Sequence, residues 1–456
     1  MDSTLGTFGD LRLDKGGLRS SNGWWRARRC ACVGWEGNRK GELRAGRFFA
    51  NPKVTAAKII AGWSEHTGAA CAGRHILAIE DRCEVKFPTT AQRRRGLGPV
   101  KKGNSFGVLV QAMVAVDASS GACLGLLGGD VWTRAGVNPI PHRERPLAER
   151  ESAHWIETAQ RAKPLLQRAA MITVMADREA DIYALWAAVP EQHCHVLTRA
   201  WKDRLLVGDD RLFAAARRFP PAGQRTIELP ARDPGQRKRT VALELRYGEV
   251  AIRRPGHETD RSLPASLRLR VVEVLQVDPA AAEEPLCWRL LTTHPIADAA
   301  EAWQMVGWYQ QRWIIEQLFR VMKSQGLQLE DSQLATAERL VKLAAAATRA
   351  ACIDIQLTQE RDGLHQQPAS DVFSKPEIET LTMLIPTLEG TTQRQRNPHP
   401  PRSLAWAAWP IARLGGWNCY YKPPGPITFR RGMEQFYAIH RGRQLETRHQ
   451  QHMRIP

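Results

Sequence analysis

The sequence has no long hydrophobic run and no disulfide pattern. Across 456 residues no apolar stretch approaches the ~20 residues needed to cross a bilayer. The amino terminus also lacks the apolar core of a signal peptide. The nine cysteines are odd in number and scattered, and Cys30 and Cys32 have the wrong spacing for a zinc knuckle. These absences argue against membrane-spanning, disulfide-framework and zinc-binding classes, and they predict a cytoplasmic protein.

Acidic residues are in deficit. The chain has 65 Lys and Arg against 47 Asp and Glu, which gives a net charge of +18. Such an excess favours a polyanionic partner, because neutralising phosphates releases counterions. Ribosomal or membrane-surface partners would produce the same excess, so charge alone indicates only that a nucleic acid is favoured. The length allows two to four domains.

One predicted helix near residue 310 has a polar face at regular spacing. At 100° per residue its polar side chains fall within roughly an 80° stripe, and they are Tyr309, Arg312, Glu316, Arg320 and Lys323. The opposite face is apolar, with Ile314, Ile315, Leu318, Val321 and Met322. A single acid among basic groups fits a metal ligand beside phosphate-binding groups. A solvated face of an ordinary amphipathic helix would give the same pattern.

Two other segments end in acids. Residues 75–81 (HILAIED) and 170–177 (AMITVMAD) each predict a short buried strand whose last residue presents a carboxylate at the sheet edge. Two strand-borne Asp and one helix-borne Glu suit two-metal phosphoryl transfer, in which oxygen ligands hold two Mg²⁺ ions about 4 Å apart. Alternatively, Asp177 is a helix N-cap and Asp81 is a polar loop residue.

Together these segments resemble the insertion sequence four family of bacterial DDE transposases. The spacing Tyr309-x2-Arg312-x3-Glu316-x6-Lys323 is that of the family's Tyr-Arg-Glu-Lys signature. Residues 177–181 (DREAD) match the segment around its second catalytic Asp, and residues 79–81 (IED) match the first. The likeness extends to residues 47–52 (RFFANP) and 411–416 (IARLGG), and so covers most of the chain.

The resemblance implies an enzyme that moves its own DNA element. Asp81, Asp177 and Glu316 would be the catalytic, metal-binding triad for two Mg²⁺ ions, for which Mn²⁺ can substitute. The enzyme would nick DNA with water, pass through a hairpin at each end and join 3′-hydroxyl ends to target DNA. Its partners would be inverted-repeat DNA at the element's ends, target DNA and a second copy in a homodimeric synaptic complex. It would work at the bacterial nucleoid and not at a membrane.

The resemblance also assigns DNA contacts. Tyr309, Arg312, Arg320 and Lys323 would grip phosphates near the scissile bond, and Arg199 would join them from the end of the fifth strand. Each could instead be a surface charge or a rim aromatic.

Two tryptophans are candidates for stacking. Trp288 lies at the position where a hairpin-forming member of the family stacks a base flipped from the DNA end. Trp313 would brace the same strand. Either tryptophan could instead simply pack in the fold.

The expected fold class is α/β: a ribonuclease-H-like mixed-sheet catalytic core with a β-rich insertion, plus helical amino-terminal and carboxy-terminal domains. Strands are predicted at 75–81, 106–116, 123–132, 170–177 and 194–199, and helices at 151–168, 180–188, 298–325, 334–358 and 404–414. The predicted domains are 1–70, which would bind DNA ends, 71–330, the core with its insertion at about 200–290, and 331–456, which would mediate dimerisation.

Two features depart from the family. Arg82 and Cys83 follow the first Asp, where the family has small hydroxyl residues, and a guanidinium there would compete with a metal ion. Arg82 would point away if strand alternation holds. Residues 16–34 are rich in Gly, Arg and Trp where the family has a helix, which suggests a local reading-frame excursion. Two alternatives follow: a catalytically decayed copy that binds DNA ends or inhibits active relatives, and a ribonuclease-H-like nuclease without joining activity.

Overall fold

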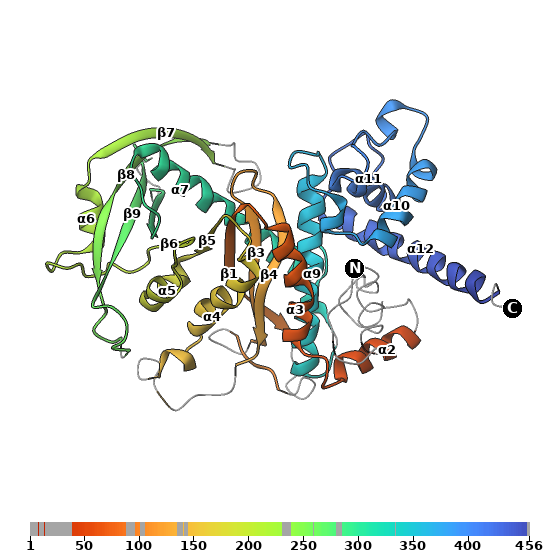
Figure 1. The fold of residues 1–456 in the computed structure, drawn as a ribbon, viewed down its shortest axis with the longest axis horizontal. Coiled ribbons are helices and arrows are strands. Elements are labelled where there is room, and N and C mark those ends of the chain that lie inside the picture. The colour runs from red at the N-terminus through yellow and green to blue at the C-terminus, as the bar shows by residue number, and fades with distance from the viewer. Residues whose placement is uncertain are drawn as a thin grey trace.

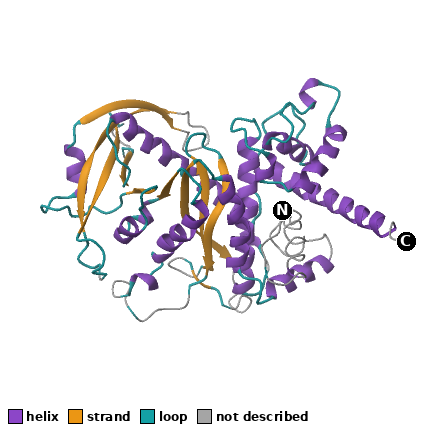
Figure 2. Ribbon diagram, in the orientation of Figure 1, coloured by secondary structure: helices purple, strands orange, loops and turns teal. Residues whose placement is uncertain are grey.

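A mixed sheet with helices on both faces forms the body of the molecule (Figures 1 and 2). The computed structural model describes residues 8, 13, 39–87, 96–100, 105–134, 140, 145–229, 239–258, 260–279, 285–332 and 334–453. The described residues build ten strands in this sheet. The irregular segment 16–34, with Cys30 and Cys32, lies outside the described residues.

Five strands form the predicted core. They are β1 (His75–Phe87), β3 (Phe106–Asp117), β4 (Cys123–Trp132), β5 (Met171–Ala176) and β6 (Cys194–Arg199). β3 runs antiparallel to both β1 and β4, whereas β5 is parallel to β1 and β6 is parallel to β5. The spatial order β4-β3-β1-β5-β6 is that of a ribonuclease-H-like sheet, which confirms the expected fold class. A short strand, β2 (Gly98–Pro99), pairs with β3.

The strand β1 is longer than predicted. It continues past Asp81 to Phe87 and pairs with β3 along its length, so Asp81 lies in mid-strand and not at the strand's end. The expectation that the strand ends at residue 81 is therefore wrong. The alternative, in which Asp81 is a loop residue, is also wrong. Beyond Asp81 the charged residues alternate with buried Cys83, Val85 and Phe87, a period-two pattern that a half-buried strand requires.

The β-rich insertion continues the same sheet. Its strands are β7 (Pro221–Leu229), β8 (Arg239–Arg253), β9 (Ser266–Gln276) and β10 (Cys287–Thr292). β10 pairs antiparallel with β6, and the order then runs β10-β9-β8-β7 away from the core (Figure 1). The short helix α6 (Leu212–Arg218) packs against β8. This confirms a β-rich segment between the fifth core strand and the Glu316 helix.

Helices cover the core sheet on both faces. α4 (Ala153–Ala162) and α5 (Tyr183–Ala188) lie on one face, where Ile76 and Ala78 of β1 point. α3 (Ala56–Ala70) and α9 (Ala337–Glu360) lie on the other, with Leu77 and Ile79. Because alternate residues of β1 face opposite sides, Asp81 shares the α9 face and Arg82 the α4 face.

Helices dominate the two ends of the described chain. α2 (Arg39–Ala50) precedes α3, and α10 (Lys375–Leu388), α11 (Leu404–Leu414) and α12 (Pro426–Met453) follow α9. The last three lie beyond α9, on the side away from the insertion (Figure 1). α11 contains Pro410 within its length. None of the helices described is long and apolar enough to span a membrane.

Candidate active site

The helix carrying the signature residues is broken in two. α7 (Ala299–Gln311) ends before Arg312, α8 (Trp313–Arg320) begins after it, and a π turn (Val321–Gln325) follows. The expected single helix over 298–325 is therefore wrong. Tyr309, in the last turn of α7, lies in the core at 5% exposure and packs against Trp288 of β10. π turns are frequent at functional sites, and this one carries Lys323.

Asp81 and Asp177 are neighbours across the parallel pair β1 and β5. Ile79 pairs with Met175, each acid comes two residues later in its own segment, and the charge of Asp177 acts on Asp81. Burial raises the pKa of Asp81 to about 7, and the negative charge of Asp177 adds to this rise. The pKa of Asp177 is also raised, chiefly by burial. An acid in β1 and an acid that directly follows β5 thus lie close together in a partly desolvated site.

Asp177 has a second role in the local structure. It is the N-cap of the short 3₁₀ turn Arg178–Ala180, and its Oδ1 accepts a hydrogen bond from the Glu179 backbone N–H at 2.7 Å. The capping role considered from the sequence is therefore real. It occupies one oxygen of the carboxylate, and the cap fixes the direction in which the side chain leaves the strand.

Arg312 joins the strand acids to the helix acid. Its Nη1 donates to Asp81 Oδ2 at 3.0 Å, and its Nη2 forms an ion pair with Glu316 four residues along. The side chains of Asp81 and Arg312 are 13% and 16% exposed, and that of Glu316 is 31% exposed. Carboxylates from β1, from the end of β5 and from α8 therefore converge around one guanidinium.

The donor set suits Mg²⁺ in its chemistry. Asp81, Asp177 and Glu316 supply the hard oxygen ligands that Mg²⁺ prefers, and the repulsion between the two Asp would be relieved by a divalent cation. Within the described part of the chain, no three His, Cys, Asp or Glu side chains gather closely enough to hold a metal ion. The Arg312 guanidinium takes the place between Asp81 and Glu316. A metal ion would require Arg312 to leave it.

Several predicted DNA contacts lie next to these acids. The Tyr309 ring packs edge-on against Trp288 of β10 with centroids 5.8 Å apart, and the Arg312 guanidinium is 5.8 Å from the Tyr309 centroid. Burial raises the pKa of Tyr309 to about 12. Arg199, the last residue of β6, donates from Nη2 to the Cys287 carbonyl at 3.2 Å. The structure thus brings Tyr309, Trp288, Arg199 and Arg312 together.

The remaining predicted residues divide between the interior and the surface. Lys323 reaches the buried thiol of Cys83, which lies two residues after Asp81 on the same strand face. Arg320 is exposed, and its guanidinium lies 5.7 Å from the centroid of Trp313, which is 48% exposed. Lys323 therefore stays near the acids, whereas Arg320 and Trp313 form an outward-facing pair.

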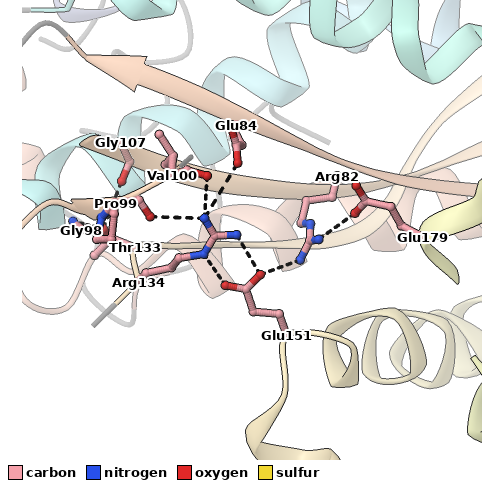
Figure 3. A network of polar contacts seen from close by, with 10 residues as sticks. All are labelled: Arg82, Glu84, Gly98, Pro99, Val100, Gly107, Thr133, Arg134, Glu151 and Glu179. Atoms are coloured by element: carbon pink, nitrogen blue, oxygen red, sulfur yellow. Dashed lines mark hydrogen bonds and ion pairs between the residues drawn. The ribbon is translucent and has the colours of Figure 1, made fainter. Parts of the chain in front are cut away.

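Arg82 points away from the carboxylates. Its Nη1 lies 3.0 Å from Glu151 Oε2 and its Nη2 lies 2.6 Å from Glu179 Oε2 (Figure 3). Arg134 pairs with the same Glu151 from the other side. Two acids thus hold the Arg82 guanidinium on the α4 face, so it does not compete with a cation at Asp81.

Asp181 was not singled out from the sequence. Its buried carboxylate accepts from the backbone N–H groups of Trp201 and Lys202 and from Arg204 Nε, each at 2.7 Å. It therefore ties the turn after β5 to the loop after β6. The signal for it was its place at the end of the DREAD segment, four residues after Asp177.

A match to a known protein family bears on this chemistry. Residues 151–353 match the family described as "Transposase DDE domain", a segment that includes Asp177 and Glu316 and begins after Asp81. A cryo-EM structure of a piggyBac transposase synaptic complex with hairpin DNA aligns at a TM-score of 0.35 and 11% identity. That alignment covers 82% of this chain and 54% of the other, so the chain spans about half the length of that protein. A similarity this low carries no argument. The domain match supports a DDE transposase family for this chain.

Proposed function

We propose that the chain is a cut-and-paste DNA transposase of the insertion sequence four type, with Asp81, Asp177 and Glu316 as its catalytic residues. One observation carries the proposal: acids from three separate segments meet around Arg312. The reaction would be hydrolytic nicking at the element's end, a hairpin on that end and strand transfer to target DNA. The match to a transposase DDE domain supports the reaction class.

The three carboxylates would hold the metal. Asp81 and Asp177 would bind from the sheet and Glu316 from α8. Bound Mg²⁺, or Mn²⁺ in its place, would activate the attacking oxygen and stabilise the leaving one. The cap on Asp177 and the strand pairing on both sides of Asp81 fix the two carboxylates before substrate binds. Such preorganisation keeps the cost of assembling the site low.

Arg312 would exchange partners when DNA binds. A guanidinium matches a phosphate with two parallel hydrogen bonds, so a DNA phosphate can replace Asp81 and Glu316 as its partner. That exchange would free both acids for metal. Lys323 would add a point charge beside Cys83, and Arg199 would approach from β6. Tyr309 would contact a phosphate through its hydroxyl, because its ring is buried.

The aromatic residues would handle the displaced strand. Trp288 is half-buried on β10 and touches Tyr309, so a base stacked on it would lie beside the carboxylates. Stacking on an indole offsets the cost of unstacking a base. Exposed Trp313 and Arg320 would contact DNA farther out on α8.

Other parts of the chain would supply recognition and assembly. Residues 1–70 would read the inverted repeat through base contacts, and the net charge of +18 would supply phosphate affinity to both element ends and target DNA. Residues 331–456 would pair two copies, so that both ends are held before cutting. The helices described at both ends of the chain support this division.

The test is cleavage of a duplex that carries the element's terminal repeat, with Mg²⁺ or Mn²⁺. Wild type should nick at the repeat boundary, and Glu316→Gln should lose at least about 10²-fold in rate. Glu157→Gln is the matched control, because Glu157 is an exposed acid on α4, across the sheet from the site. Equal cutting by wild type and Glu316→Gln would contradict the proposal.

The two alternatives give different outcomes in the same assay. A decayed copy would bind the repeat without cutting it, and a simple nuclease would cut without joining ends to target DNA. Arg82 was one of two arguments for decay, and its pairing with Glu151 and Glu179 speaks against it. The other, the segment 16–34, lies outside the described residues.

A further inference from the structure

A second concave surface begins directly after Asp177. It is a cavity of about 770 Å³ on the α4 face of the sheet, between the turn after β5, the loop after β6 and the turn at 255–258. Arg178 and Glu179, which follow Asp177 in sequence, line it, as does Arg82. The cavity therefore adjoins the candidate active site but contains none of its three acids.

The lining of the cavity is cationic. Its basic residues are Arg82, Arg150, Arg178, Lys202 and Arg204, against the acidic Glu179, Asp181 and Glu258. Arg82 neutralises Glu179, and Arg204 neutralises Asp181. The pKa of His257, which also lines the cavity, is lowered by partial desolvation and by the positive charges of Lys202, Arg150 and Arg204. A cavity with this potential attracts a phosphate.

An exposed tryptophan stands at the cavity on a fixed backbone. Trp201 is 59% exposed, and it lines the cavity together with Lys202. The N–H groups of both residues donate to Asp181, which is itself only 3% exposed and is also paired with Arg204. The Arg178 guanidinium lies 4.7 Å from the Trp201 ring centroid. Exposure of the indole is therefore built into the fold and does not result from a loose loop.

An anchored indole beside cations is the combination that binds single-stranded nucleic acid. The indole offers a face to a base, and the cations take the phosphate that follows it. A base inside a duplex has both faces covered by its neighbours, so it cannot stack on Trp201 without leaving the helix. The geometry therefore favours an unpaired nucleotide over duplex DNA.

We propose that this cavity binds one unpaired nucleotide of a DNA strand, with its base stacked on Trp201 and its phosphate held by Lys202 and the neighbouring cations. The inference rests on the proposed function, because the strand would be one that also passes Asp177. Asp181 is then a positioning residue that presents Trp201. The unpaired nucleotide could come from the flank of the element's end or from target DNA.

The first experiment measures binding of fluorescein-labelled oligothymidine to the full-length chain by anisotropy. Trp201→Ala should weaken binding by about fivefold or more, and Trp201→Phe should restore most of it. Lys202→Gln should reduce the slope of log affinity against log salt concentration by about the amount expected for one phosphate contact. Tyr421→Ala is the matched control, since Tyr421 is 81% exposed between α11 and α12.

A second experiment identifies the strand. 2-Aminopurine placed at successive positions in the flank of an end duplex, or in target DNA, is quenched when it stacks on an indole. Quenching at one position, lost in Trp201→Ala, supports the proposal and names the source. Oligothymidine affinity unchanged in Trp201→Ala overturns the proposal, even if Lys202→Gln weakens binding, because phosphate contact alone needs no indole.

The two proposals fail in different ways. If the chain is not a transposase, no variant and no wild type will cut the end duplex, yet Trp201→Ala will still weaken oligothymidine binding. If only the inference is wrong, wild type will cut in a metal-dependent way and Trp201→Ala will bind oligothymidine as wild type does.

Discussion

Arg312 places a positive charge among the acids of the candidate site. It lies between the carboxylates of Asp81 and Glu316 in a partly desolvated site, where one positive charge offsets the crowding of acids. The same charge repels a divalent ion. We therefore expect Arg312 to have two effects in the protein without DNA: to stabilise the acids and to keep the affinity for a metal ion low.

Replacing Arg312 by Gln should tighten metal binding in the absence of DNA. Loss of one positive charge beside Asp81 should raise Mn²⁺ affinity by roughly tenfold, as measured by electron paramagnetic resonance of free Mn²⁺. Arg320→Gln is the control, because Arg320 is exposed on the outer side of α8. Weaker Mn²⁺ binding in Arg312→Gln would mean that the guanidinium organises the site instead of competing for it.

Asp81 should destabilise the metal-free protein at neutral pH. Its pKa in the folded state is about 7, above the ordinary value of 3.8, so the folded state binds more protons than the unfolded state between these values. Protonation thus favours folding as pH falls, and ionisation costs stability above pH 7. Asp81→Asn should therefore raise the free energy of unfolding at pH 8 by at least about 1 kcal/mol.

That gain should shrink as pH falls from 7 towards 4, because the wild-type carboxyl becomes neutral. Urea denaturation of both proteins at pH 8 and pH 5 measures the difference, and subtracting wild type from variant removes the contributions of other groups. A gain that is equal at both pH values would contradict the raised pKa.

At the residue scale, the family resemblance singled out Asp81, Asp177 and Glu316, and the structure places Asp81 and Glu316 on the same guanidinium. Their catalytic role stays a prediction. The direction of Arg82, away from the acids, follows from its place next to Asp81 on a strand. The burial of Tyr309 could not be predicted from a regular helix. Tyr309 packs against Trp288 of β10, a strand of the insertion, and no helical pattern reveals that contact.

At the element scale, local patterns located the strands and helices but not all of their ends. The predicted first strand ended too early, at residue 81, because charged residues follow Asp81. In the structure every second position beyond Asp81 is buried and the strand continues to Phe87. Those charges are tolerated because Arg82 finds Glu151 and Glu179, and Lys86 donates its backbone N–H to Glu330. These partners are distant in sequence, so no local pattern reveals them.

Packing of α11 against α12 depends on a close approach at one glycine. A Cβ added at Gly432 would lie 1.8 Å from the Ile411 carbonyl oxygen, whereas one added at Gly442, on the same helix, would meet nothing within 4 Å. Gly432→Ala should lower the free energy of unfolding by about 1–3 kcal/mol through overpacking. Gly442→Ala should raise it by about 0.5–1 kcal/mol, because alanine is the better helix former.

Guanidinium denaturation of the two variants beside wild type tests this pair. Because both substitutions are Gly to Ala in one helix, intrinsic propensity alone would move them in the same direction. Stabilisation of both would show that α12 does not pack on α11 in the way the structure has it.

At the scale of the whole molecule, one sheet links the insertion to the ribonuclease-H-like core. β10 pairs with β6 through Leu290, Leu291 and Thr292, and places Trp288 and Arg199 beside Tyr309. The sequence predicted a β-rich insertion and its place in the chain. It did not predict that the insertion extends the core sheet, because strand pairing across about 90 residues leaves no local pattern.

The site itself also depends on the fold of the whole molecule. Acids from β1, β5 and α8 are more than 90 residues apart in sequence, and only the assembled fold brings them to Arg312. If these acids are the metal ligands of a transposase, exchanging a ligand oxygen for sulfur should change which metal ion supports the activity.

The most direct test replaces Asp177 by Cys and measures nicking of the terminal-repeat duplex in Mg²⁺ and in Mn²⁺. Thiolate is a poor ligand for Mg²⁺ but an acceptable one for softer ions. The account predicts no nicking by Asp177→Cys in Mg²⁺, partial recovery in Mn²⁺, and cutting by wild type in both. Nicking by Asp177→Cys in Mg²⁺ at the wild-type rate would contradict it.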